Sequence, residues 1–145
     1  MDRRSVLMCA AIFLAGFIAG QAAPRATAIA QAPGMNRVFE IRTYTAPDGK
    51  LEELHKRFRD HTLRIFQKHD MTSVAYFRPQ DAPLKDNTLI YVLAHPSREA
   101  AKKNWADFQA DPEWQKVSAE SQVNGRIVSK VESVFADPAD YSPVK

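Results

Sequence analysis

The sequence contains little cysteine and few glycines, and both shortages exclude classes of chemistry. Cys9 is the only cysteine among the 145 residues, so a disulfide within one chain cannot form. The five glycines form no phosphate-binding loop, and neither the G-x-S-x-G nor the H-E-x-x-H motif occurs. We find no convincing metal-ligand spacing, since His55 and Asp60, or His69 and Asp70, cannot converge on one helix face. We therefore expect no metal site and no bound cofactor.

Long apolar runs are also scarce, and the longest lies at the N-terminus, over Val6–Ala19. A membrane span needs about 20 such residues. The run follows Arg3-Arg4 and precedes small residues, which is the order of a secretory signal peptide and fits the twin-arginine export route. We predict a signal peptide over 1–30, cleaved within 22–32, and a linker over 31–36; the alternative is an uncleaved anchor. Cleavage predicts a periplasmic or secreted protein without stable membrane insertion.

No excess of one charge distinguishes the chain. The formal net charge is +3, with 26% of the residues charged. The predicted leader holds three arginines and one aspartate, so its cleavage lowers the net charge by two. A nearly neutral domain lacks the basic surface on which nucleic-acid binding depends. We therefore expect no nucleic-acid partner.

Residues 37–136 alternate between strand and helix patterns and are expected to form one domain. Alternating apolar and polar residues predict strands, and apolar residues three and four positions apart predict an amphipathic helix. The expected strands are 38–45, 71–79, 88–95 and 127–136; the expected helices are 50–69, 97–110 and 113–122. The predicted helix N-caps are Asp48, Ser97 and Asp111. This β-α-β-β-α-β order predicts an α+β, ferredoxin-like fold, a four-stranded antiparallel sheet with helices on one face. Residues 137–145 are expected to form an extended tail.

The second and third predicted strands carry apolar or aromatic residues on both sides. In 88–95 the sequence TLIYVLAH is almost continuously apolar, and Val74 and Tyr76 alternate with Ala75 and Phe77. Helices that cover one face of the sheet leave the other face exposed, and an exposed apolar face marks an interface. We therefore expect a homodimer, in which a second copy covers this face.

Two short motifs connect the sequence to a known family. The first strand carries Glu40, Arg42 and Tyr44 at alternating positions, and Asp111-Pro112-Glu113-Trp114 precedes the last strand. Together with the Pro-Asp-Gly-Lys-Leu turn and the strand SVAYFRP, these motifs resemble the NIPSNAP domain over about 36–136. The resemblance implies a ferredoxin-like domain that pairs two sheets into a dimeric α/β barrel. It implies no established reaction.

Six residues are candidates for a ligand site. The six candidates are Glu40, Arg42, Tyr44, His61, Tyr76 and Tyr91. We expect the Glu40, Arg42 and Tyr44 side chains to point into the space between paired sheets or into a cavity beside it. There they form either a structural ion pair or a pocket in which Arg42 binds an anionic or carbonyl group. His61 borders the apolar stripe of the first helix, where it has either a structural role or that of a ligand or base.

Three functions are compatible with these residues. The first is an exported homodimeric module of binding or structural role, with a small hydrophobic or anionic ligand. The second is a cofactor-independent monooxygenase or isomerase of the dimeric α/β barrel type. The third is a haem-binding protein. Whether the protein is an enzyme is left open, because a fold alone does not define a reaction.

Overall fold

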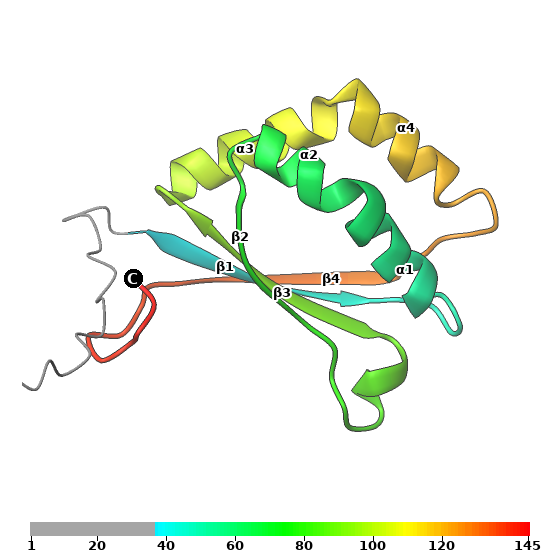
Figure 1. Ribbon diagram of the computed structural model, residues 1–145, viewed down its shortest axis with the longest axis horizontal. Helices are drawn as coiled ribbons and strands as arrows, with labels where there is room; N and C mark the ends of the chain where they lie inside the picture. The colour runs from blue at the N-terminus through cyan, green and yellow to red at the C-terminus, as the bar shows by residue number, and fades with distance from the viewer. Residues whose placement is uncertain (1–36) are drawn as a thin grey trace, which may run out of the picture. The chain divides into compact units, whose positions relative to one another are not determined.

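The computed structural model describes residues 37–145 (Figure 1). The predicted signal peptide over 1–30 and the linker over 31–36 therefore lie outside the described residues. Within the described part, no helix is long and apolar enough to cross a membrane.

Four strands form one antiparallel sheet. They are β1 (Val38–Thr45), β2 (Thr72–Phe77), β3 (Thr88–His95) and β4 (Lys130–Ala136), in the spatial order β2-β3-β1-β4. β1 lies between β3 and β4; it pairs with β3 along its whole length and with β4 from Phe39 to Thr45. This order confirms the predicted ferredoxin-like fold, in which the first and third strands are central.

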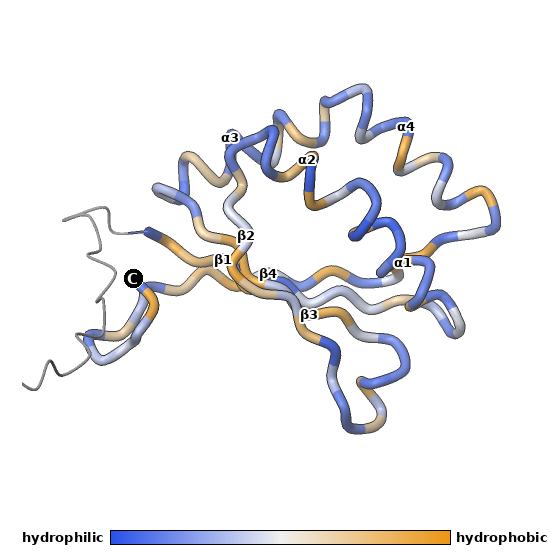
Figure 2. Tube along the Cα trace, in the orientation of Figure 1, coloured by the Kyte–Doolittle hydropathy of each residue, from blue (hydrophilic) through white to orange (hydrophobic). Residues whose placement is uncertain are grey.

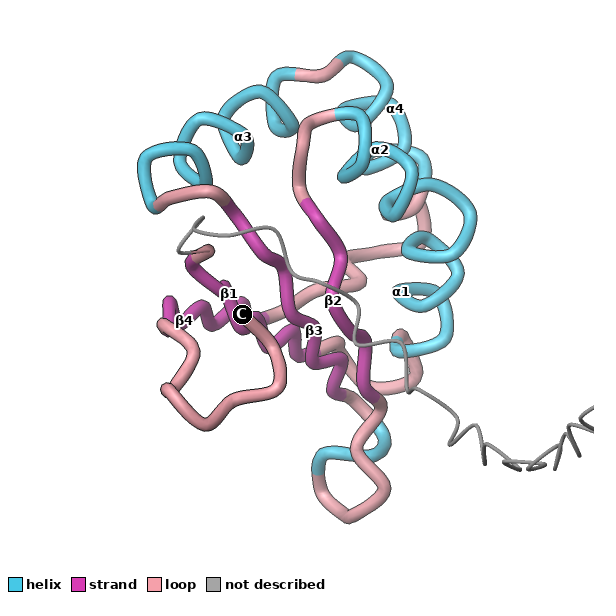
Figure 3. The backbone as a smooth tube through the Cα atoms, turned by 60° about the vertical axis from the view of Figure 1, so that its left-hand side comes forward, coloured by secondary structure: helices cyan, strands magenta, loops and turns pink. Residues whose placement is uncertain are grey.

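The helices cover one face of the sheet (Figures 1 and 3). They are α1 (Leu51–Arg57), α2 (Leu63–Lys68), α3 (Arg98–Ala110) and α4 (Pro112–Glu120). The helix expected over 50–69 is not a regular α-helix, because a π-helical turn at Phe58–Thr62 separates α1 from α2. The Thr62 hydroxyl donates a hydrogen bond to the Arg57 carbonyl at 3.2 Å inside this turn. π-Helical turns are rare in proteins overall, and those that occur are often found at functional sites.

The predicted helix caps are mostly confirmed. The Ser97 hydroxyl accepts from the Ala100 amide at 3.1 Å, and the Asp111 carboxylate accepts from the Glu113 amide at 2.8 Å. The prediction for Asp48 is wrong, because α1 begins at Leu51 without a side-chain cap. The last strand is shorter than the expected 127–136, because β4 begins at Lys130. Ile127 precedes the strand and is fully buried in the core.

The core lies between the sheet and the helices. Leu54, Phe58 and Phe66 from the helices meet Tyr91 and other side chains of β3. Phe58 packs edge-to-face against Tyr91, with ring centroids 5.2 Å apart. Each large side chain buried here contributes about 1.5–3 kcal/mol. Figure 2 shows that apolar residues concentrate along the strands, while the 80–87 loop is mainly hydrophilic.

The other face of the sheet is open and apolar. Ile41, Phe77 and Val134 on this face are 39%, 52% and 61% exposed. The C-terminal tail 137–145 lies against one part of the face, where a cavity of about 560 Å³ separates tail residues such as Tyr141 from Phe39 and other sheet residues. Figure 3 shows the tail and the helices on different sides of the sheet. The uncovered apolar residues are the reason to expect a partner on this face.

Candidate functional site

The carboxylate of Glu40 is the centre of a buried polar network, here called the Glu40 network. Its Oε1 accepts from Arg42 Nη1 at 2.6 Å and from Ser133 Oγ at 2.7 Å. Its Oε2 accepts from Trp105 Nε1 at 2.7 Å and lies 3.2 Å from His95 Nε2. The ionised carboxylate only accepts, so the Nε2 of His95 carries a proton. The network therefore joins β1 to β3, β4 and α3.

The contacts of Glu40 keep it ionised. Burial alone would raise the pKa of its carboxyl, but the hydrogen bonds from His95, Ser133, Trp105 and Arg42 outweigh burial and lower the pKa to about 2. A general base at neutral pH works best with a pKa near 7. Glu40 is therefore suited to holding its neighbours in place and is a poor proton acceptor.

Arg42 and Tyr44 do not lie where the sequence led us to expect. The Arg42 guanidinium carbon is 4.1 Å from the Trp105 ring centroid, and Nη2 is 3.4 Å from the Tyr44 hydroxyl. The register pairs Arg42 with Tyr91, whose side chain is fully buried in the core. Glu40, Arg42 and Tyr44 therefore face the helices. Of the two expected positions, the space between paired sheets is wrong, whereas the expected ion pair of Glu40 and Arg42 is present. The Glu40 carboxylate, the two terminal nitrogens of Arg42 and the Tyr44 hydroxyl find partners within the described part of one chain, whereas Arg42 Nε has none there.

Tyr76 and Tyr91 belong to the same layer. Their rings stack with centroids 5.6 Å apart and 16° between the planes, and Tyr44 packs edge-to-face on Tyr91 at 5.2 Å. Burial raises the pKa of both Tyr76 and Tyr91. Neutral, stacked phenols in a filled core support packing more directly than acid–base chemistry. Five of the six candidate residues thus lie together, in the core between sheet and helices.

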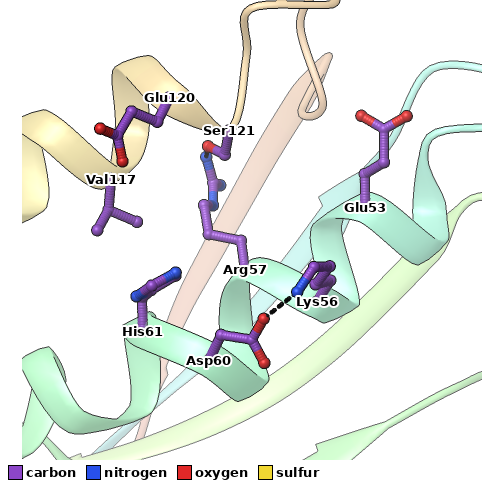
Figure 4. Close-up of a pocket in the computed structure, with 8 residues that line it drawn as sticks. All are labelled: Glu53, Lys56, Arg57, Asp60, His61, Val117, Glu120 and Ser121. Carbon is purple, nitrogen blue, oxygen red and sulfur yellow. Dashed lines mark hydrogen bonds and ion pairs between the residues drawn. The ribbon is translucent and has the colours of Figure 1, made fainter.

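His61 lies apart from these five, on the π-helical turn, where it is exposed on the wall of a different cavity. We call this cavity the helix pocket; it lies between α4 and the helix that runs through the π-helical turn (Figure 4). Its volume is about 250 Å³. The lining residues are Glu53, Lys56, Arg57, Asp60, His61, Val117, Glu120 and Ser121.

Arg57 is the buried cation of the helix pocket. Its neighbours in the first helix are mainly charged, yet the residue is only 6% exposed. Its Nη1 donates to Ser121 Oγ at 3.3 Å, and its guanidinium carbon lies 5.1 Å from the Trp114 ring centroid. Burial lowers the pKa of this arginine, although a guanidinium stays charged at any physiological pH. These contacts come from a distant part of the chain, so they cannot be read from residue spacing.

The helix pocket combines one buried cation, an apolar wall at Val117 and charged groups at its rim. Among residues 37–145, no three His, Cys, Asp or Glu side chains are grouped to hold a metal ion. The helix pocket is small and its lining is mostly charged, so it does not offer the apolar slot that a haem macrocycle requires. Binding of a small polar molecule is the chemistry that this arrangement supports best.

Solved structures with the same fold come from bacterial proteins of the NIPSNAP type. A NIPSNAP family protein with unknown function from Agrobacterium tumefaciens is 24% identical, with a TM-score of 0.67, and the match covers 77% of this chain and 96% of that one. An uncharacterized NIPSNAP-like domain protein from Burkholderia xenovorans is 19% identical, with a TM-score of 0.66 and coverage of 76% and 91%. A candidate antibiotic biosynthesis monooxygenase from Nitrosomonas europaea is 10% identical, with a TM-score of 0.51 and coverage of 77% and 99%.

No curated protein matches the sequence. The profile of the NIPSNAP family, by contrast, matches residues 39–143, from β1 into the C-terminal tail. This match includes every strand and helix described above and confirms the resemblance drawn from the sequence motifs. The chain belongs to the NIPSNAP family.

Proposed function

We propose that this protein is an exported, homodimeric module that binds a small molecule in the helix pocket of each subunit. The observation that carries the binding role is the helix pocket itself, in which Arg57 is buried without a carboxylate partner among the described residues. The apolar leader over 1–30 supports export. No catalytic step is part of the proposal.

The open sheet face supports the homodimer. Ile41 and Val134 on neighbouring strands form an apolar surface that water would solvate poorly. A second copy presents the same surface, so two copies related by a two-fold axis would bury the open sheet face of each subunit against that of the other. The tail 137–145 occupies part of this face and would move aside or pack at the edge of the interface.

A cofactor-independent monooxygenase or isomerase is the second candidate. The observation in its favour is the position of His61 on the pocket wall, close in sequence to the buried cation of Arg57. The likeness to the Nitrosomonas europaea protein concerns the fold alone at 10% identity. Oxygen uptake that depends on an added small molecule and disappears in His61→Ala would favour this candidate.

Native mass spectrometry of the protein purified from its own cells tests the proposal. We expect the mass of a dimer of the cleaved chain, together with extra mass from a retained small molecule. Light scattering gives the subunit number independently. A monomer in both measurements would refute the dimer, and an intact leader would refute cleavage and export in the form proposed.

A further inference from the structure

The cation of Arg57 differs from that of the half-buried Arg42 in its partners. Arg42 forms an ion pair with Glu40 at 2.6 Å. Within residues 37–145, Arg57 has no carboxylate within 4.0 Å, and its one side-chain hydrogen bond goes to the neutral Ser121 hydroxyl. The Nε atoms of both arginines lack a hydrogen-bond partner in this range, so the missing counter-charge is what sets Arg57 apart. A buried charge without a counter-charge is costly, and a bound anion would remove much of that cost.

The acidic residues of the helix pocket are already bound to lysines. Lys50 pairs with Glu53 at 2.7 Å, and Lys56 pairs with Asp60. Lys116 lies 3.9 Å from Glu120. These carboxylates are neutralised at the exposed rim, so none of them serves as the counter-ion of Arg57. No carboxylate of the helix pocket therefore balances the charge of Arg57, and the space beside its guanidinium is where an anion could bind.

We propose that the helix pocket binds the carboxylate of a small organic acid, with the Arg57 guanidinium as the anchor. This inference rests on the proposed binding function and names its ligand class. The guanidinium presents a planar set of donors that matches a carboxylate in a two-point contact. The Ser121 hydroxyl, which already accepts from Nη1, lies beside that contact.

The remaining walls select for size and charge. A volume of about 250 Å³ admits an acid of a few carbons or one aromatic ring. Val117, which is 7% exposed, offers the acid's apolar part a dry surface. Arg57 is the one buried cation of the lining, and the Lys56 charge is already paired with Asp60, so a monocarboxylate matches the site better than a phosphate dianion.

Calorimetric titration of the full-length protein with sodium butyrate and sodium benzoate tests the proposal. Butyramide and benzamide are the matched neutral probes, and inorganic phosphate is the anionic competitor. We expect saturable binding of at least one carboxylate, roughly tenfold or more tighter than its amide, because charge-assisted hydrogen bonds are about twice as strong as neutral ones. Chemical-shift changes at the Ser121 and His61 amides should accompany binding.

Arg57→Gln should weaken carboxylate binding by at least about tenfold. Arg59→Gln is the matched control, because Arg59 is exposed, pairs with Glu52 and does not line the pocket. It should bind as the unmodified protein does. If Arg57→Gln does not fold, Val117→Phe fills the pocket while retaining the cation, and it should abolish binding as well.

Three results would overturn the inference. Amides that bind as tightly as carboxylates, with Arg57→Gln unaffected, would leave the helix pocket as a ligand site but not an anion site, so the proposed function would survive. Phosphate that binds more tightly than either carboxylate would replace the ligand class. Absence of any binding up to millimolar concentrations would refute the inference and the helix pocket as the site, while the dimer would still be judged by light scattering.

Discussion

The Trp105 indole donates a hydrogen bond of 2.7 Å to the Oε2 of Glu40, which ties α3 to the central strand β1. The same indole lies 4.1 Å from the Arg42 guanidinium carbon, so one aromatic ring contacts both members of the Glu40–Arg42 ion pair. Through these contacts the charged pair is held beneath α3, with the Glu40 side chain only 2% exposed. The stability of the domain should therefore depend on each partner in this network.

Glu40→Gln should destabilise the domain by roughly 2–4 kcal/mol at neutral pH. The amide retains one acceptor oxygen but turns donor hydrogens toward Trp105 or Arg42, and the charge of Arg42 loses its counter-ion. The free energy of unfolding in urea measures the change. Glu132→Gln on the exposed side of β4 is the control and should stay within about 0.5 kcal/mol of the unmodified protein. A loss of similar size in both variants would contradict a special role for the network.

The stability contributed by Glu40 should be lost in acid. The pKa of this carboxyl is lowered to about 2 in the folded protein from 4.5, its value without these contacts. Between these pH values the unfolded state binds the proton more readily, so lowering the pH favours unfolding. The contribution is complete above about pH 4.5, falls as the pH is lowered and is gone below about pH 2. Its size is roughly 3 kcal/mol.

The measurement is the unfolding free energy of the unmodified protein and of Glu40→Gln across this range. Other carboxylates titrate in both proteins, so they largely cancel in the difference. That difference should shrink steadily from pH 5 to pH 2. If the difference in unfolding free energy stays constant over this range, the surroundings of Glu40 do not lower the pKa of its carboxyl.

Trp105→Phe should weaken the same network from the helix side. The substitution removes the indole donor and retains an aromatic ring for the core, at a cost of about 1–3 kcal/mol. Combined with Glu40→Gln, it should cost less than the sum of the two single changes by about 0.5–3 kcal/mol, because both remove the same hydrogen bond. Strict additivity in this double-mutant cycle would mean that the two residues act independently.

Val134→Lys should dissociate the proposed dimer without unfolding the subunit. Val134 is 61% exposed on the open sheet face, so lysine is tolerated in a monomer, whereas a dimer would bury two unpaired charges. The dimer dissociation constant should rise by roughly a hundredfold or more, as measured by light scattering over a concentration series. Val123→Lys is the matched control, because Val123 is 77% exposed in the segment after α4, and it should leave the subunit number unchanged.

The strand and helix order was predictable because local patterns express it directly. Alternation in VFEIRTYT identified β1, and the Ser97 and Asp111 caps set the starts of α3 and α4. The Asp-Pro-Glu-Trp element and the Glu-x-Arg-x-Tyr strand were specific enough to indicate the family, which the profile match confirms. Even the group of Glu40, Arg42 and Tyr44 on one strand face was visible at alternating positions.

The sequence alone determined the order of elements, the fold class and the clustering of those three polar residues. It did not determine which face of the sheet they occupy. Both faces of β3 are apolar, and alternation along a strand shows which residues share a face but not which face meets the helices. Only the packing of Trp105 against Arg42 placed them under the helices. The burial of Arg57 likewise required the tertiary structure: its guanidinium contacts Trp114 and Ser121, which are more than fifty residues away in the chain, and residue spacing does not predict those contacts.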